Sequence, residues 1–222
     1  MIKLFLIKGV FKGFLKAPFL EVRLFVMKKI ITIGREYGAG GRSVAKIVAE
    51  KMGISYYDRD LIMKTAEELS YLTADDVRKW EESVPINAGL MQSLFDQKNK
   101  SLGEMIWHAQ LEAIRKIADK ESCVIVGRNA GFILREFDHL LRVYIYAEKD
   151  WRVKHMQEIS PEMDIESIKA KMNAIDKKRH AYIKMYTGDN SEELTHYDLT
   201  LNSRRLGFEK AAELIISAAE NI

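Results

Sequence analysis

A short apolar segment, a glycine-rich stretch and an amphipathic segment follow one another between residues 28 and 53, which read KKIITIGREYGAGGRSVAKIVAEKMG. Residues 28–33 predict a strand, and the helical spacing of apolar residues in 42–52 predicts a helix that ends at Gly53. Glycines between a strand and a helix let backbone N–H groups turn inward around a phosphate, and the helix N-terminus adds positive charge. The unit therefore indicates a phosphate-binding loop, with a ligand-free glycine-rich turn as the alternative.

Four further apolar runs predict strands, at 54–57, 122–127, 140–147 and 197–202. Helical patterns lie between them, and Ser160 before Pro161 predicts the start of a long helix that reaches about residue 186. Strands separated by helices indicate a doubly wound parallel sheet of five strands with helices on both faces. The helical stretch 61–120 is too long for one crossover, so we expect a subdomain over the carboxyl edge, where such folds bind ligands.

Length and composition exclude several classes of protein. With 222 residues, 47% apolar and 30% charged, the chain suits one soluble domain. A net charge of +3 without an arginine–aromatic stripe does not indicate a nucleic acid partner. The single Cys123 excludes a disulfide within the chain and a cysteine cluster for zinc, and we expect it in the core. We expect a cytoplasmic protein, and no feature of the sequence indicates an oligomeric state.

The first 26 residues are basic and apolar, but lysines interrupt every apolar run. Such runs are too short for a signal peptide or a membrane span. A membrane-surface helix is one interpretation. We favour the other, in which Met27 is the natural start, residues 1–26 are upstream sequence or a disordered tail, and residues 27–222 form the domain. No stable membrane association is expected.

The glycine-rich stretch meets the pattern G-x-x-x-x-G-K-[ST] only in part. Gly41, Arg42 and Ser43 fill its last three places, with arginine for lysine, and Glu36 replaces its first glycine. The lysine of that pattern reaches the β- and γ-phosphates, and the hydroxyl of the serine or threonine that follows binds Mg²⁺. We therefore expect Arg42 to act on phosphate, Ser43 to help place Mg²⁺, and the loop to comprise Gly38, Ala39, Gly40, Gly41, Arg42 and Ser43.

A second polar group follows the strand expected at 122–127. Gly127, Arg128 and Asn129 come where that strand ends, and so at the same sheet edge as the glycine loop. A guanidinium there suits a bidentate contact with two phosphate oxygens. The alternative is a structural arginine paired with a surface carboxylate.

From about residue 28 to its end, the chain resembles the cytidylate kinase-like branch of the nucleoside monophosphate kinases. The resemblance is carried by ITIGREYGAGGRSVAKIVAEKMGISYYDRDLI, VIVGRNAGFIL and YDLTLNS. Gly38, Gly40 and Ser43 match the family loop G-x-x-G-x-G-K-G-T, and Asp58 matches an aspartate after the second strand. A G-R-D-x-G motif after the third strand is matched by Gly127, Arg128 and Gly131, with Asn129 in place of its aspartate.

The resemblance implies a P-loop nucleotide kinase fold with a helical acceptor-binding region at 61–120 and a mobile lid at about 160–190. The lid spacing D-x-x-R is matched by Asp176 and Arg179. The family's donor is ATP with Mg²⁺, and the acceptor is a nucleoside monophosphate, CMP or dCMP first. Implied acceptor-binding residues are Asp58, Arg59, Lys64, Arg128, Asn129 and Gly131. The expected catalytic residues are Arg42, Arg128 and Arg179.

Two departures from the family pattern leave alternatives open. In the family register the lysine falls on Gly41 and the first glycine on Arg35, so either Arg42 or Arg35 supplies the missing charge. Val126 stands where the family often has an acidic residue near the metal. A non-catalytic nucleotide-binding or regulatory module is therefore the alternative to the kinase, and a kinase of another small metabolite is a further one.

Overall fold

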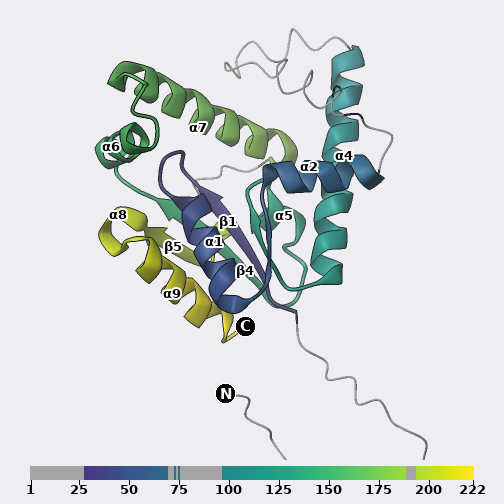
Figure 1. Cartoon of the computed structure of the whole chain (residues 1–222). Coiled ribbons are helices and arrows are strands. Elements are labelled where there is room, and N and C mark those ends of the chain that lie inside the picture. The colour runs from purple at the N-terminus through teal and green to yellow at the C-terminus, as the bar shows by residue number, and fades with distance from the viewer. Residues whose placement is uncertain (1–27, 70–72, 74, 76–96, 189–193) are drawn as a thin grey trace, which may run out of the picture.

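A five-stranded parallel sheet forms the centre of the protein (Figure 1). The computed structural model describes residues 28–69, 73, 75, 97–188 and 194–222. The strand order is β2-β3-β1-β4-β5, and Ile33 in β1 lies opposite Val126 in β3 and Val143 in β4. The predicted parallel sheet of five strands is confirmed. Its strands are β1 (Ile30–Arg35), β2 (Ser55–Tyr57), β3 (Cys123–Val126), β4 (Leu140–Tyr146) and β5 (Leu199–Asn202).

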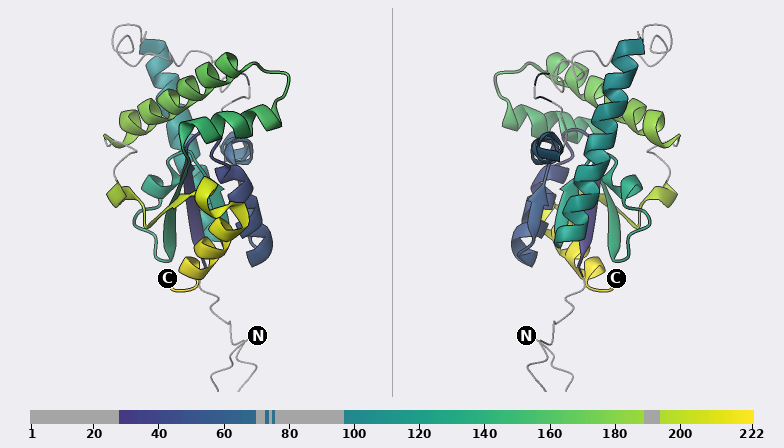
Figure 2. Two further views of the ribbon diagram at one scale, coloured as in Figure 1. Left: turned by 90° about the vertical axis from the view of Figure 1, so that its left-hand side faces the viewer. Right: turned by 90° about the vertical axis from the view of Figure 1, so that its right-hand side faces the viewer.

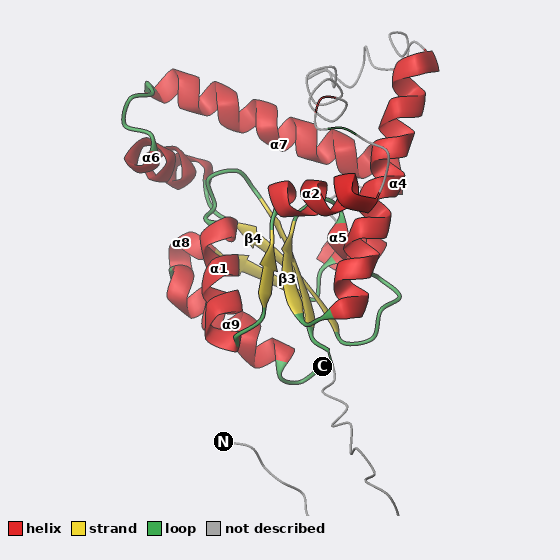
Figure 3. Cartoon of the chain, turned by 45° about the vertical axis from the view of Figure 1, so that its right-hand side comes forward, coloured by secondary structure: helices red, strands yellow, loops and turns green. Residues whose placement is uncertain are grey.

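Helices cover both faces of the sheet, as Figures 2 and 3 show. On one face, α1 (Gly41–Met52) and α9 (Phe208–Ala219) pack on the strands. On the other face, α4 (Gln97–Lys120) packs together with α5 (Ala130–Ile133), which lies over β1 and β4. The remaining helical segments are α2 (Arg59–Leu69), α6 (Lys149–Ile159), α7 (Ile165–Thr187), η1 (Leu194–His196) and α8 (Ser203–Leu206).

The two faces of the sheet bury two different sets of apolar side chains. Alternate residues of a strand point to opposite faces, so Ile31 and Ile33 of β1 pack against α1 and α9. Cys123 and Ile125 of β3 pack against α4 and α5 on the other face. Cys123 is fully buried, as expected, and burial raises the pKa of its thiol to about 12. A thiol of that kind is inert.

Helix α7 lies across the carboxyl edge of the sheet, together with α6 and α2 (Figure 1). The prediction that the long helix starts at Ser160 and Pro161 is wrong. Residues 160–164 form a turn, and α7 begins at Ile165 because Asp164 caps it: its carboxylate accepts hydrogen bonds from the backbone N–H of Ser167 at 2.9 Å and from the Ser167 hydroxyl at 2.6 Å.

The stretch 61–120 contains most of α2 and the whole of α4, which pack against each other. Met63 and Ala66 of α2 contact Ile106, Ala109 and Ala113 of α4. Residues 76–96 of this stretch and the segment 1–26 lie outside the described residues. Among the described helices, none is long and apolar enough to span a membrane.

Candidate functional site

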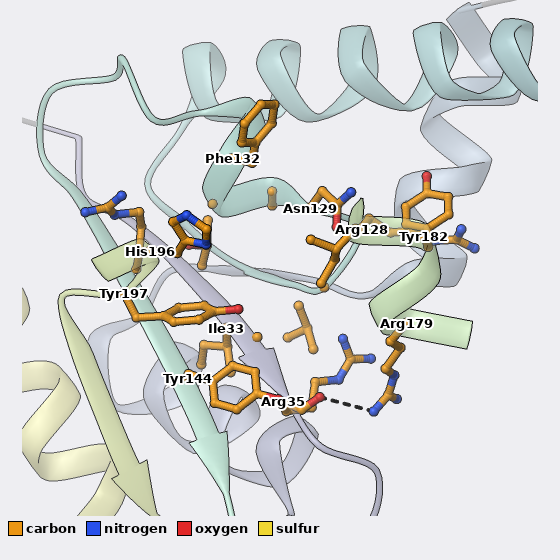
Figure 4. A pocket seen from close by; sticks show the side chains of 18 of the residues that line it. Ile33, Arg35, Arg128, Asn129, Phe132, Tyr144, Arg179, Tyr182, His196 and Tyr197 are labelled. Atoms are coloured by element: carbon orange, nitrogen blue, oxygen red, sulfur yellow. Dashed lines mark hydrogen bonds between the residues drawn. The ribbon is translucent and has the colours of Figure 1, made fainter. Parts of the chain in front are cut away.

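A cavity of about 810 Å³ lies at the carboxyl edge of the sheet, between α5, the second half of α7 and residues 196–197 (Figure 4). Within the described part of the chain, no aspartate or glutamate lines it. Its lining is strongly basic, and a cavity with one sign of charge concentrates ligands of the opposite sign. The arginines that line it are Arg35, Arg42, Arg59, Arg128, Arg135, Arg142 and Arg179.

Arg35 is the last residue of β1, and its side chain lies close to two glycines. A Cβ built on Gly41 would lie 2.7 Å from Cβ and 3.0 Å from Cγ of Arg35, and one built on Gly127 would collide with its guanidinium. Burial, together with the charges of Arg179 and Arg42, lowers the pKa of Arg35 to about 9. Among the described residues, its guanidinium forms no ion pair and no hydrogen bond.

Asp176 and Arg179, the two expected lid residues, both lie beside the start of the glycine loop. Arg179 donates a hydrogen bond of 3.2 Å to the backbone carbonyl of Arg35, drawn as a dashed line in Figure 4. Burial lowers the pKa of Arg179 although Asp176 lies 3.5 Å away. Asp176 accepts a 2.7 Å hydrogen bond from the backbone N–H of Tyr37. In this structure, α7 therefore contacts the loop directly.

Residues 127–129 connect β3 to α5 through an unusual backbone conformation. Gly127, Arg128 and Asn129 have φ values of 79°, 55° and 55°. Positive φ costs free energy in residues other than glycine, and such residues gather at functional sites. The guanidinium of Arg128 lies 5.8 Å from the ring centre of Tyr182, and both line the cavity. The side-chain nitrogen of Asn129 is buried without a hydrogen-bond partner in the described structure.

Of the glycine loop, only Arg42 lines the cavity, and Tyr37 lines it just before the loop begins. Its outer side packs closely: a Cβ on Gly38 would lie 2.9 Å from Met156, and one on Gly40 would collide with Phe208. Both glycines have positive φ, which suits glycine at a tight turn. The expected loop residues thus include the three residues before α1 and the first three residues of α1. Ser43 and Arg42 are both exposed there.

The structure brings some of the expected acceptor-binding residues together and leaves others outside. Arg59 lines the cavity with Arg128, Asn129 and Gly131. Asp58 instead caps α2, accepting hydrogen bonds from the N–H groups of residues 60 and 61 at 3.1 and 3.3 Å. Lys64 is exposed on α2 and is not among the lining residues. Arg59, at the start of α2, therefore lines the cavity, whereas Lys64, later in the same helix, does not.

Aromatic residues that the sequence did not single out form the end of the cavity beside β5. The rings of Tyr144 and Tyr197 lie 4.8 Å apart, and burial raises the pKa of both hydroxyls. Nearby, Arg142 and Asp198 form an ion pair of 2.7 Å. Tyr144 belongs to an apolar strand pattern, where a tyrosine facing a cavity looks the same as one packed in the core. No sequence signal distinguishes the two.

Metal ligands are sparse around the cavity. Among the described residues, no group of three or more His, Cys, Asp or Glu side chains could hold a metal ion. The exposed hydroxyl of Ser43 is the only expected metal ligand, and it lies on the first turn of α1. These residues fit a Mg²⁺ ion that arrives on nucleotide phosphates, since Mg²⁺ keeps several waters and needs few protein ligands in such sites.

Comparison with known proteins gives consistent matches. The family model for the cytidylate kinase-like family matches residues 30–205. A cytidylate kinase from Archaeoglobus fulgidus is 27% identical over 192 residues, which are 86% of this chain and 94% of that protein.

Solved structures agree on the fold. A protein from Eubacterium ventriosum described as uncharacterized has a TM-score of 0.68 at 27% identity, covering 88% of this chain and 99% of that one. A gluconokinase from Sinorhizobium meliloti has a TM-score of 0.51 at 15% identity, covering 87% of this chain and 94% of that one, and supports the fold alone. The parallel sheet with its glycine loop is a P-loop kinase fold, and the chain belongs to the cytidylate kinase-like family.

Proposed function

We propose that this protein transfers the γ-phosphate of ATP to a nucleoside monophosphate, with CMP or dCMP as the favoured acceptor. The observation that carries the proposal is the cavity lined by seven arginines and, among the described residues, no carboxylate, beside a strand–glycine loop–helix unit. Phosphoryl transfer needs such charge because it brings the oxygens of two phosphate-bearing substrates together. The cytidylate kinase of Archaeoglobus supports the choice of acceptor.

On the donor side, the loop Gly38–Ser43 and the first N–H groups of α1 hold the β-phosphate. The first N–H groups of a helix have no partners within the helix, and they carry its partial positive charge. Arg42 adds a full positive charge at the same helix end. Bound Mg²⁺ supplies further neutralisation of the phosphate oxygens, and the Ser43 hydroxyl is its protein ligand.

On the acceptor side, Arg128 and Arg59 hold the phosphate of the nucleoside monophosphate. The planar guanidinium forks suit two oxygens of one phosphate. Asn129, whose side-chain nitrogen has no partner in the described structure, donates to the acceptor. The base lies toward α2, which begins at Arg59.

Arg179 meets the charge on the transferred group from the lid region, residues 160–190. It already lies in the cavity and contacts the backbone of Arg35, so α7 needs no large movement to deliver it. Charge placed in advance where it develops in the transition state is the usual source of rate enhancement in such transfers.

A nucleotide-binding module without turnover is the second candidate, and the absence of a lysine at position 41 favours it. A pure ATP binder needs no second phosphate site. The lining of the cavity by Arg59 and Arg128, in addition to Arg42 of the loop, supports the kinase over the module. A kinase of a different small metabolite would use the same cavity.

The test is ADP release from ATP, measured by a coupled assay over CMP, dCMP, UMP, AMP and a set of sugar acids. We expect turnover with CMP or dCMP above all others, and a raised KM for the acceptor in Arg128→Met. Arg115→Ala, an exposed change on α4 away from the cavity, is the matched control and should behave like the parent. Turnover with a sugar acid alone would establish the metabolite kinase, and ATP binding without ADP release would establish the module.

A further inference from the structure

Gly41 is a glycine that the backbone does not require. It is the first residue of α1, and its φ is not among the positive values of the described glycines. Glycine is the poorest helix former after proline. Space explains it instead: a Cβ at position 41 would lie 2.7 Å from Cβ and 3.0 Å from Cγ of Arg35. Arg35 therefore occupies the place into which a side chain at position 41 would extend.

The far end of the Arg35 side chain meets a second glycine. A Cβ on Gly127, after β3, would collide with Nη1 of Arg35. The side chain thus runs from the start of α1 to the end of β3, and both neighbours are glycines that leave it room. Its guanidinium reaches the cavity, where Arg42 and Arg179 are also found (Figure 4 labels Arg35 and Arg179).

The lysine of a phosphate-binding loop reaches the β- and γ-phosphates of the donor. In this chain a side chain at position 41 would meet Arg35, whose guanidinium lies against Gly127 at the end of β3, and the described residues provide it no carboxylate partner. A cation held in a buried position without a counter-charge is unfavourable until an anion binds. Arg42, by comparison, is exposed on α1, where water and salt screen its charge.

We propose that Arg35, extending from the preceding strand, replaces the missing lysine at position 41 as the cation on the donor phosphates. The proposal rests on the function proposed above and adds the residue that neutralises the donor. It also explains why arginine at 35 and glycine at 41 occur together: a lysine at 41 and an arginine at 35 would need the same space.

The test is a double-mutant cycle of Arg35→Gly, Gly41→Lys and the two changes combined, with Arg35→Met measured beside it. Methionine preserves the packing length without the charge. Affinity for ADP by calorimetry and kcat/KM for ATP are measured for each. We expect Arg35→Met to lose about 100- to 1,000-fold in kcat/KM, the range for one well-placed transition-state donor. Gly41→Lys should also lose activity, because its side chain collides with Arg35.

The double variant is the most informative, because it places a lysine at position 41 after removing the Arg35 side chain that would collide with it. We expect it to exceed each single variant at least tenfold in ADP affinity, a strong departure from additivity. Melting temperatures of all variants, with Arg115→Ala as control, separate folding from binding. Parental affinity in Arg35→Met, or a double variant no better than the singles, overturns the proposal and leaves the kinase function standing. Failure of the parent to bind ADP or ATP overturns both.

Discussion

Two arginines beside the glycine loop illustrate two uses of a buried positive charge. Arg152 of α6 is only 8% exposed, and it forms ion pairs with Asp176 at 2.7 Å and with Glu36 at 3.4 Å. It also donates a 2.9 Å hydrogen bond to the backbone carbonyl of Tyr37. Arg35 lies on the other side of the same loop, near Arg42 and Arg179, and the described residues give it no acidic partner.

The difference indicates which arginine serves the fold and which serves a ligand. The cost of burying Arg152 is offset within the protein, because Asp176 and the carbonyl of Tyr37 accept its hydrogens and Glu36 adds a second negative charge. The cost of burying Arg35 is offset only when an anion arrives. A fold that retains such a group sacrifices some stability for function, as binding sites commonly do. Four changes test this contrast.

The largest effect on stability is expected for Arg152→Met. Removing this guanidinium leaves Asp176 and Glu36 without their main counter-charge near the loop. Breaking one partner of a buried ion pair typically costs about 3–5 kcal/mol in the free energy of unfolding. Urea unfolding of the ligand-free protein measures it, with the exposed change Arg205→Met as the matched control. A loss of stability as small as that of the control would show that Arg152 is not needed for the fold.

Arg35→Met should change ligand-free stability in the opposite direction. It removes a cation that burial and neighbouring charges disfavour, so we expect a gain of about 0.5–2 kcal/mol in the free energy of unfolding. The same variant should lose most of the rise in melting temperature that ADP gives the parent. A destabilised variant that keeps its response to ADP would assign Arg35 a structural role.

The pH dependence of stability provides a further test. Burial, then the charges of Arg179 and Arg42 and a smaller contribution from Arg128, lower the pKa of Arg35 from 12.5 to about 9, and Tyr56 opposes them. Because the folded-state pKa of this base is below the unfolded value, the unfolded chain binds more protons above pH 9, and folding is favoured as pH rises. Between pH 8 and 10, the free energy of unfolding of the parent should rise by about 1 kcal/mol relative to that of Arg35→Met. An unchanged difference would show that Arg35 keeps its proton over this range and would contradict the lowered pKa.

Arg42→Ala should have the smallest effect. Arg42 is exposed at the start of α1, and an exposed charge contributes about 1 kcal/mol or less, so we expect kcat/KM for ATP to fall about fivefold at most. The result is read beside Arg35→Met in the same coupled assay. A larger loss for Arg42→Ala than for Arg35→Met would assign the lysine role to Arg42.

Much of the fold followed from local pattern. Residues 28–53 contain a β-rich run, glycines and a helical repeat in sequence order, and that order is enough to predict β1, the loop and α1. The start of α7 was missed because Ser160 with Pro161 and Asp164 are both plausible caps. Only the structure shows that Asp164 bonds to Ser167.

The site was less accessible to sequence reasoning. Arg42 was the expected substitute for the missing lysine and Arg35 the alternative, because spacing cannot say which side chain turns inward. Packing distinguishes them: the contact of Arg35 with two glycines far apart in sequence depends on how β1 and β3 pair. For the same reason Tyr144 and Tyr197, which meet only in the folded sheet, gave no signal.

A crystal structure of the protein with ADP bound tests the central claim most directly. The account predicts a β-phosphate oxygen at about 2.7–2.9 Å from a guanidinium nitrogen of Arg35, the usual length of a charge-assisted hydrogen bond. The glycines at 41 and 127 should remain packed against that side chain. A β-phosphate held by Arg42, with the Arg35 guanidinium turned away from it, would contradict the account.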